Sequence, residues 1–201
     1  MPARIDVSLA ASITVVVGSS GSGKSAWLKR QIKTARRLIV WDPDDEYGGA
    51  GFHRVTTIAQ LAEALRGASA GRFAFVPASP AQFDAWSLCA FAWGNCVAVA
   101  EETADVTTPG KAPPGWGTLV RRGRKRGITL YAVTQRPSES DKTVIGNATC
   151  LHVCMLARAA DRQYMARELD VQQSEIDRIA PLEWIEKRRG VPGISRGKLK
   201  F

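Results

Sequence analysis

The chain has few of the residues that bind metals or form cross-links. Its 201 residues include only four cysteines and two histidines. The cysteines lie in apolar stretches without C-x-x-C spacing, at positions Cys89, Cys96, Cys150 and Cys154. A zinc site is therefore not expected, and buried reduced thiols are the better interpretation.

Long hydrophobic runs are also missing. No apolar run approaches the roughly 20 residues that a helix needs to cross a bilayer, so no transmembrane segment is expected. Residues 1–6 lack the apolar segment of a signal peptide, which predicts a cytoplasmic protein. Internal repeats and low-complexity segments are absent as well, and the length suits one sizeable core. We expect residues 1–201 to form a single domain.

Acidic residues are scarce relative to basic ones. The chain has 28 Lys and Arg against 19 Asp and Glu, a net charge of +9. Basic residues gather at 121–126 and again at 187–189, with Arg196, Lys198 and Lys200 beyond. A solvated charged face is the usual explanation of such runs. Contact with a nucleic acid, or catalysis across a subunit interface, is an equally good interpretation here.

The most informative motif that is present is G-x-x-x-x-G-K-S at 18–25. It follows a β-branched strand at 13–17 and precedes a helix expected at 25–32. Glycines let backbone N–H groups turn inward around an anion, and the helix N-terminus adds its dipole. Lys24 can reach the β- and γ-phosphates, and the Ser25 hydroxyl can ligand Mg²⁺. The predicted nucleotide-binding residues are Gly18, Ser19, Ser20, Gly21, Ser22, Gly23, Lys24, Ser25 and Ala26. ATP and Mg²⁺ are the expected ligands.

Strand and helix patterns alternate along the chain, which predicts an α/β fold with a mostly parallel central sheet flanked by helices. Further strands are expected at 37–42, 72–76, 96–100, 128–134 and 150–156, and helices at 58–65, 81–93, 116–126 and 159–179. Thr57 is the expected N-cap of the second helix. Residues 103–114 contain three prolines and predict a mobile loop, while the C-terminal tail could form a hairpin at one edge of the sheet.

Two adjacent carboxylates end the apolar strand at 96–100. Hydrolysis of a triphosphate needs one carboxylate in the Mg²⁺ shell and usually another to orient water. Neighbouring residues at a strand end point in different directions, so we assign Glu101 to the metal, together with Ser25, and Glu102 to the water. Asp105 is an alternative metal ligand. Gln135, after the next strand, could sense the γ-phosphate or position the water.

A longer pattern around Gln135 resembles a known superfamily. The segment GRKRGITLYAVTQRPS at 123–138 is similar to the G-R-x-x-G-h-x-h-x-x-x-T-Q-R-P-S block of the HerA/FtsK superfamily of DNA-pumping ATPases, where h is an apolar residue. IVWDP at 39–43, followed by Glu46 and Tyr47, is similar to that superfamily's strand ending in D-P-x-x-E-Y. The resemblance covers about 15–156, and its main departure is Glu101, where the family usually carries Asp.

Within that superfamily, the chain resembles the genome-packaging ATPases of tailless icosahedral viruses with an internal membrane. This resemblance implies a RecA-like P-loop core and a ring, expected to be a hexamer, with ATP bound between subunits. It also implies an arginine contributed in trans, at Arg122, Arg124 or Arg126, with Arg126 and then Arg122 preferred. The implied partners are double-stranded DNA, bound without sequence specificity, and a capsid vertex. The implied location is the host cytoplasm or the virion vertex.

The function expected from these features is an ATP-driven translocase that packages double-stranded DNA into a preformed viral capsid. A small nucleotide kinase is a second possibility, because it also pairs this phosphate loop with a compact domain. A third is an assembly or scaffold protein that binds ATP without translocating DNA, which the Glu101 departure leaves open. Stimulation of hydrolysis by DNA would separate the first function from the other two.

Overall fold

A nine-stranded sheet forms the centre of the computed structural model, which describes residues 11–49 and 51–200. The strands are β1 (Ile13–Val17), β2 (Arg37–Trp41), β3 (His53–Val55), β4 (Gly71–Phe75), β5 (Val97–Ala100), β6 (Thr129–Thr134), β7 (Cys150–Cys154), β8 (Glu183–Arg188) and β9 (Ser195–Lys198). The α-helices are α1 (Lys24–Gln31), α2 (Ile58–Leu65), α3 (Phe83–Trp93), α4 (Pro114–Arg122), α5 (Lys142–Asn147), α6 (Ala159–Leu169) and α7 (Gln173–Asp177). Short 3₁₀ helices are η1 (Pro80–Gln82), η2 (Thr103–Asp105) and η3 (Gly123–Arg126).

The strand order across the sheet is β3-β4-β2-β5-β6-β1-β7-β8-β9. The strands from β3 to β7 are parallel, whereas β8 runs antiparallel to β7, and β9 to β8. The parallel strands therefore end at one edge of the sheet, and their following loops meet there. This mostly parallel α/β sheet and the C-terminal edge hairpin confirm the predicted fold class.

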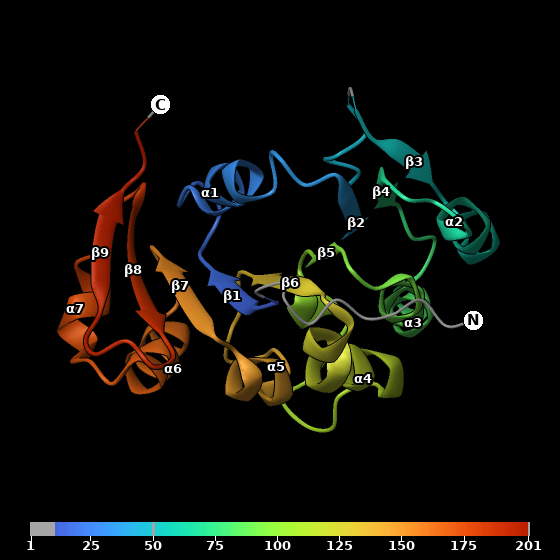
Figure 1. Ribbon diagram of the computed structural model, residues 1–201. Helices are drawn as coiled ribbons and strands as arrows, with labels where there is room; N and C mark the ends of the chain where they lie inside the picture. The colour runs from blue at the N-terminus through green and yellow to red at the C-terminus, as the bar shows by residue number, and fades with distance from the viewer. Residues whose placement is uncertain (1–10, 50, 201) are drawn as a thin grey trace.

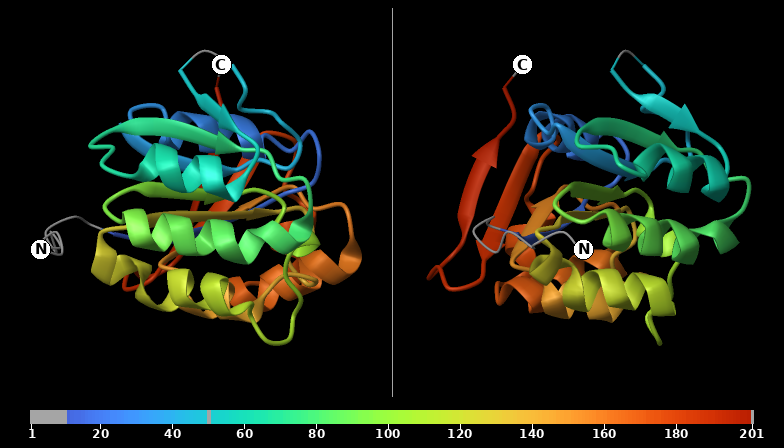
Figure 2. Two further views of the ribbon diagram at one scale, coloured as in Figure 1. Left: turned by 90° about the vertical axis from the view of Figure 1, so that its right-hand side faces the viewer. Right: turned by 45° about the vertical axis from the view of Figure 1, so that its right-hand side comes forward.

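Side chains of β1 alternate between two cores on opposite faces of the sheet. Val15 and Val17 belong to the core that also contains buried side chains of α2 to α6, whereas Val16 belongs to the core that contains Trp27 and Leu28 of α1. The sheet curves around α1, and α3, α4 and α5 lie on its other side (Figure 1). The helices α2, α3 and α4 run side by side along the strands (Figure 2). Because both faces of the sheet are buried, these strands appear in the sequence as continuous apolar runs.

The local prediction of α2 is confirmed in detail. The helix spans Ile58–Leu65, and the Thr57 hydroxyl accepts a hydrogen bond from the Gln60 N–H. The Gln60 side chain accepts the Thr57 N–H in return, which completes a capping box. The basic helix expected at 116–126 is instead divided, because α4 ends at Arg122 and η3 follows it. The short elements β3 and α5 were not predicted, since three and six residues carry too little periodicity.

The segment expected to be a mobile loop is anchored in its first half. Thr103 begins η2, is 1% exposed, and donates a hydrogen bond to the Val133 carbonyl of β6. Thr107 is also buried; it donates to the Thr103 carbonyl and accepts the Asp141 N–H. The first half of this segment is therefore not a free loop, because hydroxyl groups join it to β6 and to the segment before α5. Composition alone does not reveal such partners.

Candidate active site

The phosphate loop lies where β1 ends between the ends of β6 and β7. The Gly18 N–H donates to the carbonyl of Thr134, the last residue of β6, and the Ser19 N–H and hydroxyl both donate to the Met155 carbonyl after β7. On its other side, the Leu182 N–H donates to the Ser22 carbonyl. Three separate segments therefore hold the loop in position before α1 begins at Lys24.

Two glycines of the loop are required by close packing. A Cβ at Gly18 would lie 2.5 Å from Ser22 Oγ and 2.8 Å from Cys154 Cβ. Gly23 has φ of 97°, and a Cβ there would meet Leu199 at 2.9 Å. The N-cap position of α1 thus needs a residue without a side chain and with a left-handed backbone.

A cavity of about 330 Å³ opens in front of this loop. Residues 19–26, Glu101, Glu102 and Gln135 line it, so eight of the nine predicted nucleotide-binding residues, both glutamates and the glutamine are brought together. Gly18, the ninth, lies at the base of the loop, packed against Cys154. Asp42, Pro43, Asp44, Glu46 and Leu182 complete the lining. The cavity is therefore built from the ends of β1, β2, β5 and β6.

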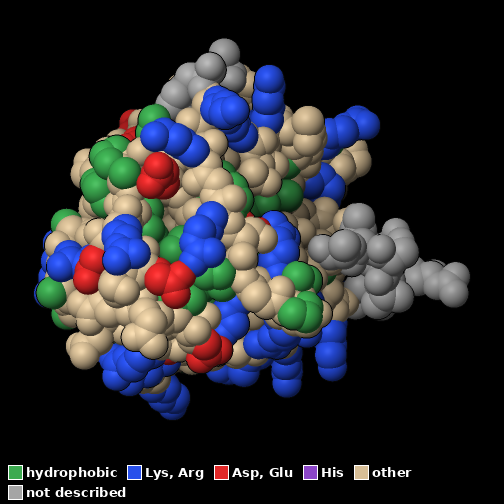
Figure 3. All heavy atoms as spheres, turned by 90° about the vertical axis from the view of Figure 1, so that its left-hand side faces the viewer, with side chains coloured by type: hydrophobic (Ala, Val, Ile, Leu, Met, Phe, Trp, Pro, Cys, Tyr) green, Lys and Arg blue, Asp and Glu red, His purple; other side chains and the backbone are tan. Residues whose placement is uncertain are grey.

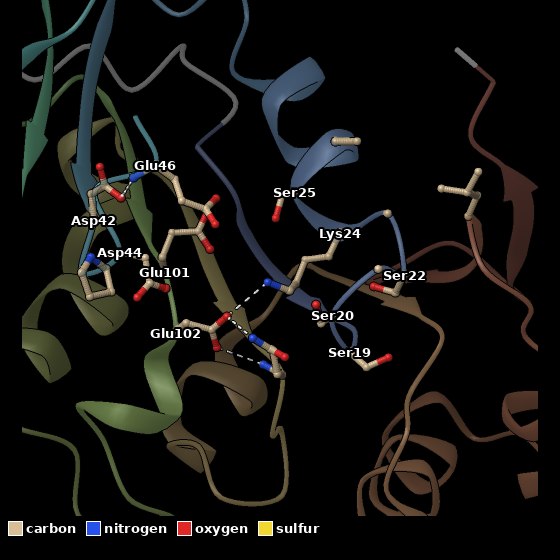
Figure 4. A pocket seen from close by; sticks show the side chains of 16 residues that line it. Ser19, Ser20, Ser22, Lys24, Ser25, Asp42, Asp44, Glu46, Glu101 and Glu102 are labelled. Carbon is tan, nitrogen blue, oxygen red and sulfur yellow. Dashed lines mark hydrogen bonds and ion pairs between the residues drawn. The ribbon is translucent and has the colours of Figure 1, made fainter. Parts of the chain in front are cut away.

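Glu102 joins the phosphate loop to the end of β6. Its Oε1 lies 3.3 Å from Lys24 Nζ and accepts a hydrogen bond of 2.9 Å from Gln135 Nε2. Its Oε2 accepts the Gln135 backbone N–H at 3.3 Å. Figure 4 shows Lys24 reaching from the start of α1 toward this carboxylate. Gln135 thus orients Glu102 with two donors, and Lys24 supplies the opposite charge.

The backbone of Glu102 also has an unusual conformation, with φ of 45° and ψ of 53°. Few residues other than glycine adopt this left-handed region, because Cβ crowds the backbone. The turn directs the two adjacent glutamates to different partners, as expected for residues at a strand end. Strain of this kind is common in active sites.

Glu101 is held by a buried tyrosine rather than by the loop. The Tyr47 hydroxyl donates to Glu101 Oε1 at 2.5 Å, and both residues are buried. Burial raises the pKa of the Glu101 carboxyl, while the hydrogen bond from Tyr47 and the charge of Lys24 oppose that rise. Asp42 accepts the N–H groups of Glu46 and Tyr47, which positions the tyrosine. Burial raises the pKa of Asp42 as well.

The charge of the cavity fits a divalent cation. Lys24 is the only Lys or Arg among the described residues that line it, whereas five of them are carboxylic acids. A triphosphate would meet net repulsion there unless a cation neutralised part of this charge. Mg²⁺ prefers oxygen ligands, and the Ser25 hydroxyl and Glu101 carboxylate both line the cavity (Figure 4). These two residues fit the metal-binding role predicted for them.

We expect the Tyr47→Phe substitution to weaken Mg²⁺-dependent nucleotide binding at low pH. The loss of the hydroxyl removes a hydrogen bond that lowers the pKa of Glu101, so this carboxyl should become protonated at a higher pH. A protonated carboxyl is a poor metal ligand, and affinity should therefore begin to fall at a higher pH than in the wild type. Titration of MgATP binding between about pH 5 and 8 measures this difference. Identical pH profiles would contradict the proposed pairing.

The predicted arginines lie away from this cavity. The Arg126 guanidinium donates to the carbonyls of Phe91 and Ala92 at the end of α3. Arg122, the last residue of α4, is exposed. Both precede β6, whereas Gln135 follows it, and a strand of six residues spans roughly 20 Å. Neither side chain contributes to the phosphate site of its own chain.

Several residues that line the cavity or hold its side chains were not predicted as part of the site. Tyr47, Asp42 and Glu46 belong to the D-P-x-x-E-Y pattern, but no role was assigned to them. The pattern itself was the available signal. No sequence pattern indicated Leu182. This residue directly precedes β8, and it reaches the loop only because β8 pairs antiparallel with β7. Asp105, the alternative metal ligand, belongs to η2 and is not part of the lining.

Comparison with known proteins gives one relative of similar sequence and several of similar fold. No family model matches the chain. Protein P9 of Pseudoalteromonas phage PM2 is 35% identical over 184 residues, which cover 88% of this chain and 83% of P9. The genome packaging NTPase B204 of Sulfolobus turreted icosahedral virus 2, in complex with AMPPCP, is similar in fold, with a TM-score of 0.80 and 16% identity over 95% of this chain and 98% of B204. VirB4 of Thermoanaerobacter pseudethanolicus has a TM-score of 0.63 and 12% identity over 98% of this chain and 91% of its own.

Proposed function

Because this chain belongs to the family of protein P9 of phage PM2, we propose that it is an ATPase that drives double-stranded DNA into a preformed viral capsid. The observation that carries the proposal is the arrangement of Glu102 between Lys24 and Gln135. It joins the ends of β5, β6 and β1, which are neighbours in the sheet. The fold shared with a viral packaging NTPase, together with the GRKRGITLYAVTQRPS segment, supports the assignment to packaging and to the HerA/FtsK superfamily.

In this proposal each residue of the cavity has a separate task. The backbone N–H groups of the loop and Lys24 bind the β- and γ-phosphates of ATP. Ser25 and Glu101 would hold Mg²⁺, which would neutralise charge on the phosphate oxygens. Glu102 orients the attacking water and accepts its proton, and Gln135 keeps that carboxylate directed at the γ-phosphate. When the nucleotide enters, Lys24 leaves the Glu102 carboxylate and binds phosphate oxygens instead.

We further propose that the active form is a ring, a hexamer by the family resemblance, that encloses duplex DNA at a capsid vertex. An arginine of one subunit would stabilise charge at the nucleotide of the next, since the arginines before β6 do not serve their own site. Arg122 suits this role better than Arg126, because it is exposed whereas Arg126 is engaged at the end of α3. Residues 1–201 would act as one ATPase domain, in the host cytoplasm and at the virion vertex. No helix among the described residues has the length and apolar character needed to span a membrane.

We expect ATP hydrolysis to be stimulated by double-stranded DNA, with activity that rises steeply with protein concentration as subunits assemble. Steady-state phosphate release, measured with and without duplex DNA over a range of protein concentrations, tests this. A Lys24→Ala preparation is the control for contaminating ATPases. Hydrolysis independent of both DNA and protein concentration would contradict the translocase. Binding of ATP without turnover would favour a scaffold, and phosphate transfer to a nucleoside monophosphate would favour a kinase.

A further inference from the structure

Charge is distributed unevenly between the two edges of the parallel sheet. The segments that follow β2, β5 and β6 carry acidic residues, among them those of the nucleotide cavity. The five connections from a helix into a parallel strand lie at the opposite edge and contain no Asp or Glu. These connections span 32–36, 66–70, 94–96, 123–128 and 148–149. The charged residues of these five connections are therefore all cations.

Exposed cations of this edge form what we call the basic edge. Its members lie before β4, β2 and β6 and at the end of β8, and they are Arg66, Lys33, Arg36, Arg124, Lys125, Arg188 and Arg189. Of these, Arg66 and Arg188 form ion pairs with Glu63 and Glu186, but both arginines keep more than half of their side-chain surface exposed. Such exposed pairs contribute little and exchange readily with other anions. Figure 3 shows the face on the β9 side, where Lys and Arg cover more of the surface than Asp and Glu.

Helix dipoles account for only one member of the basic edge, Arg189. Helices end at this edge, and their terminal carbonyls attract cations. Three arginines serve such carbonyls, and one of them belongs to the basic edge. The Arg37 guanidinium donates to the carbonyl of Trp93 and that of Arg126 to those of Phe91 and Ala92, all at the end of α3. Arg189 donates to the carbonyl of Gly146 in the last turn of α5. The members of the basic edge remain exposed to solvent.

The basic edge has dimensions that suit a nucleic-acid duplex. It runs from β4 to β8, which are six positions apart in the sheet order. Neighbouring strands are about 4.8 Å apart, so the basic edge is about 29 Å long. Duplex DNA presents one negative charge per about 1.7 Å of axis. Most members of the basic edge are arginines, and one planar guanidinium group can donate two parallel hydrogen bonds to a phosphate.

From this geometry we propose that the basic edge binds the phosphate backbone of double-stranded DNA, on the side of the sheet opposite the nucleotide cavity. The inference rests on the proposed function and names where its DNA lies. Contacts from these side chains would be sequence-independent, since they reach phosphates and not base edges. The parallel strands, five residues or about 17 Å long in β1, would connect the ATP site with the DNA surface.

A membrane surface rich in anionic lipids is a less suitable partner. Surfaces that insert into lipid headgroups combine cations with exposed apolar side chains. Among the described residues, the exposed large hydrophobic side chains are Leu88 and Val191. Only Val191 is near the basic edge, in the turn between β8 and β9. One valine offers little apolar surface for insertion.

The test compares charge reversals at the two edges. Lys33→Glu/Arg36→Glu and Lys125→Glu change the basic edge without touching the nucleotide cavity. The matched control is Lys111→Glu/Lys142→Glu, which changes the charge as much as the double variant does, at exposed residues outside the basic edge. Binding of a labelled random-sequence duplex of about 30 base pairs is measured by fluorescence anisotropy over a range of salt concentrations. Circular dichroism and ATP hydrolysis without DNA show that each variant is folded.

We expect the Lys33→Glu/Arg36→Glu variant to bind duplex DNA at least about tenfold more weakly at about 0.1 M salt, with a salt dependence reduced by about two phosphate contacts. Lys125→Glu should be weakened less, and the control should stay within about twofold of the wild type. ATP hydrolysis without DNA should be unchanged.

Three results would overturn this inference. The first is wild-type affinity for DNA in the basic-edge variants, and the second is weakened DNA binding in the control variant. The third is that the basic-edge variants lose binding to anionic phospholipid vesicles but still bind DNA. The translocase proposal is judged separately, by whether DNA stimulates hydrolysis in the wild type. If DNA binds at the basic edge but does not stimulate hydrolysis, the DNA-binding role of the basic edge is supported and the translocase proposal is rejected.

Discussion

Replacement of Lys24 by alanine is expected to abolish tight binding of nucleoside triphosphates. Lys24 is the only Lys or Arg among the described residues of the cavity, and its ammonium is 3.3 Å from Glu102. A charge-assisted hydrogen bond contributes about 1.5–3 kcal/mol, and this side chain can make two with the β- and γ-phosphates. We therefore expect MgATP affinity to fall by a factor of about 10² or more. Isothermal titration with MgATP measures the loss directly.

Lys29→Ala provides the matched control for this experiment. Lys29 lies on the same helix, but it is about half exposed and its ion pair with Glu46 is 3.9 Å long. Its loss should change nucleotide affinity by less than about twofold, because exposed ion pairs of this kind contribute little. Melting curves of both variants are needed, since Lys24→Ala leaves Glu102 without its positive partner. A folded Lys24→Ala protein with wild-type affinity would show that the loop does not bind phosphates.

Replacement of Glu102 by glutamine should separate nucleotide binding from hydrolysis. The amide cannot accept a proton from water, so the hydrolytic rate should fall by about 10²–10⁴, the usual contribution of a general base. Binding should be retained or become tighter, because ATP would no longer have to displace the Glu102 carboxylate from Lys24. Single-turnover hydrolysis and a parallel binding titration measure the two effects. The exposed Glu63, on α2, supplies a Glu→Gln control with no expected effect on either quantity.

Two results would argue against this role of Glu102. Full hydrolytic activity in the Glu102→Gln variant would exclude the carboxylate as the base that activates water. Equal losses of binding and hydrolysis would instead indicate that Glu102 mainly positions Lys24. The outcome matters for the proposed function, because a scaffold protein that only binds ATP should not need a base at this position.

The phosphate loop and most strands could be predicted because their signals are local. Gly18, Gly23 and Lys24 lie within six residues of one another, and their spacing reflects the demands of one turn. The N-cap at Thr57 is equally local, and it was predicted at the right residue. The pairing of Glu101 with Tyr47 was not predicted, because the two residues are 54 positions apart and the contact depends on β2 lying beside β5.

Residue types and short spacings in the sequence were enough to show that a phosphate loop joins a buried strand to a helix, that two glutamates end another buried strand, and that cations outnumber anions. The tertiary structure alone decided which glutamate meets Lys24, that Gln135 holds that glutamate, and that Tyr47 holds its neighbour. It also placed scattered cations, from Lys33 to Arg189, along one edge of the sheet. The physical reason is that strand order brings distant segments within reach of a hydrogen bond or an ion pair, and periodicity along the chain carries no record of that order.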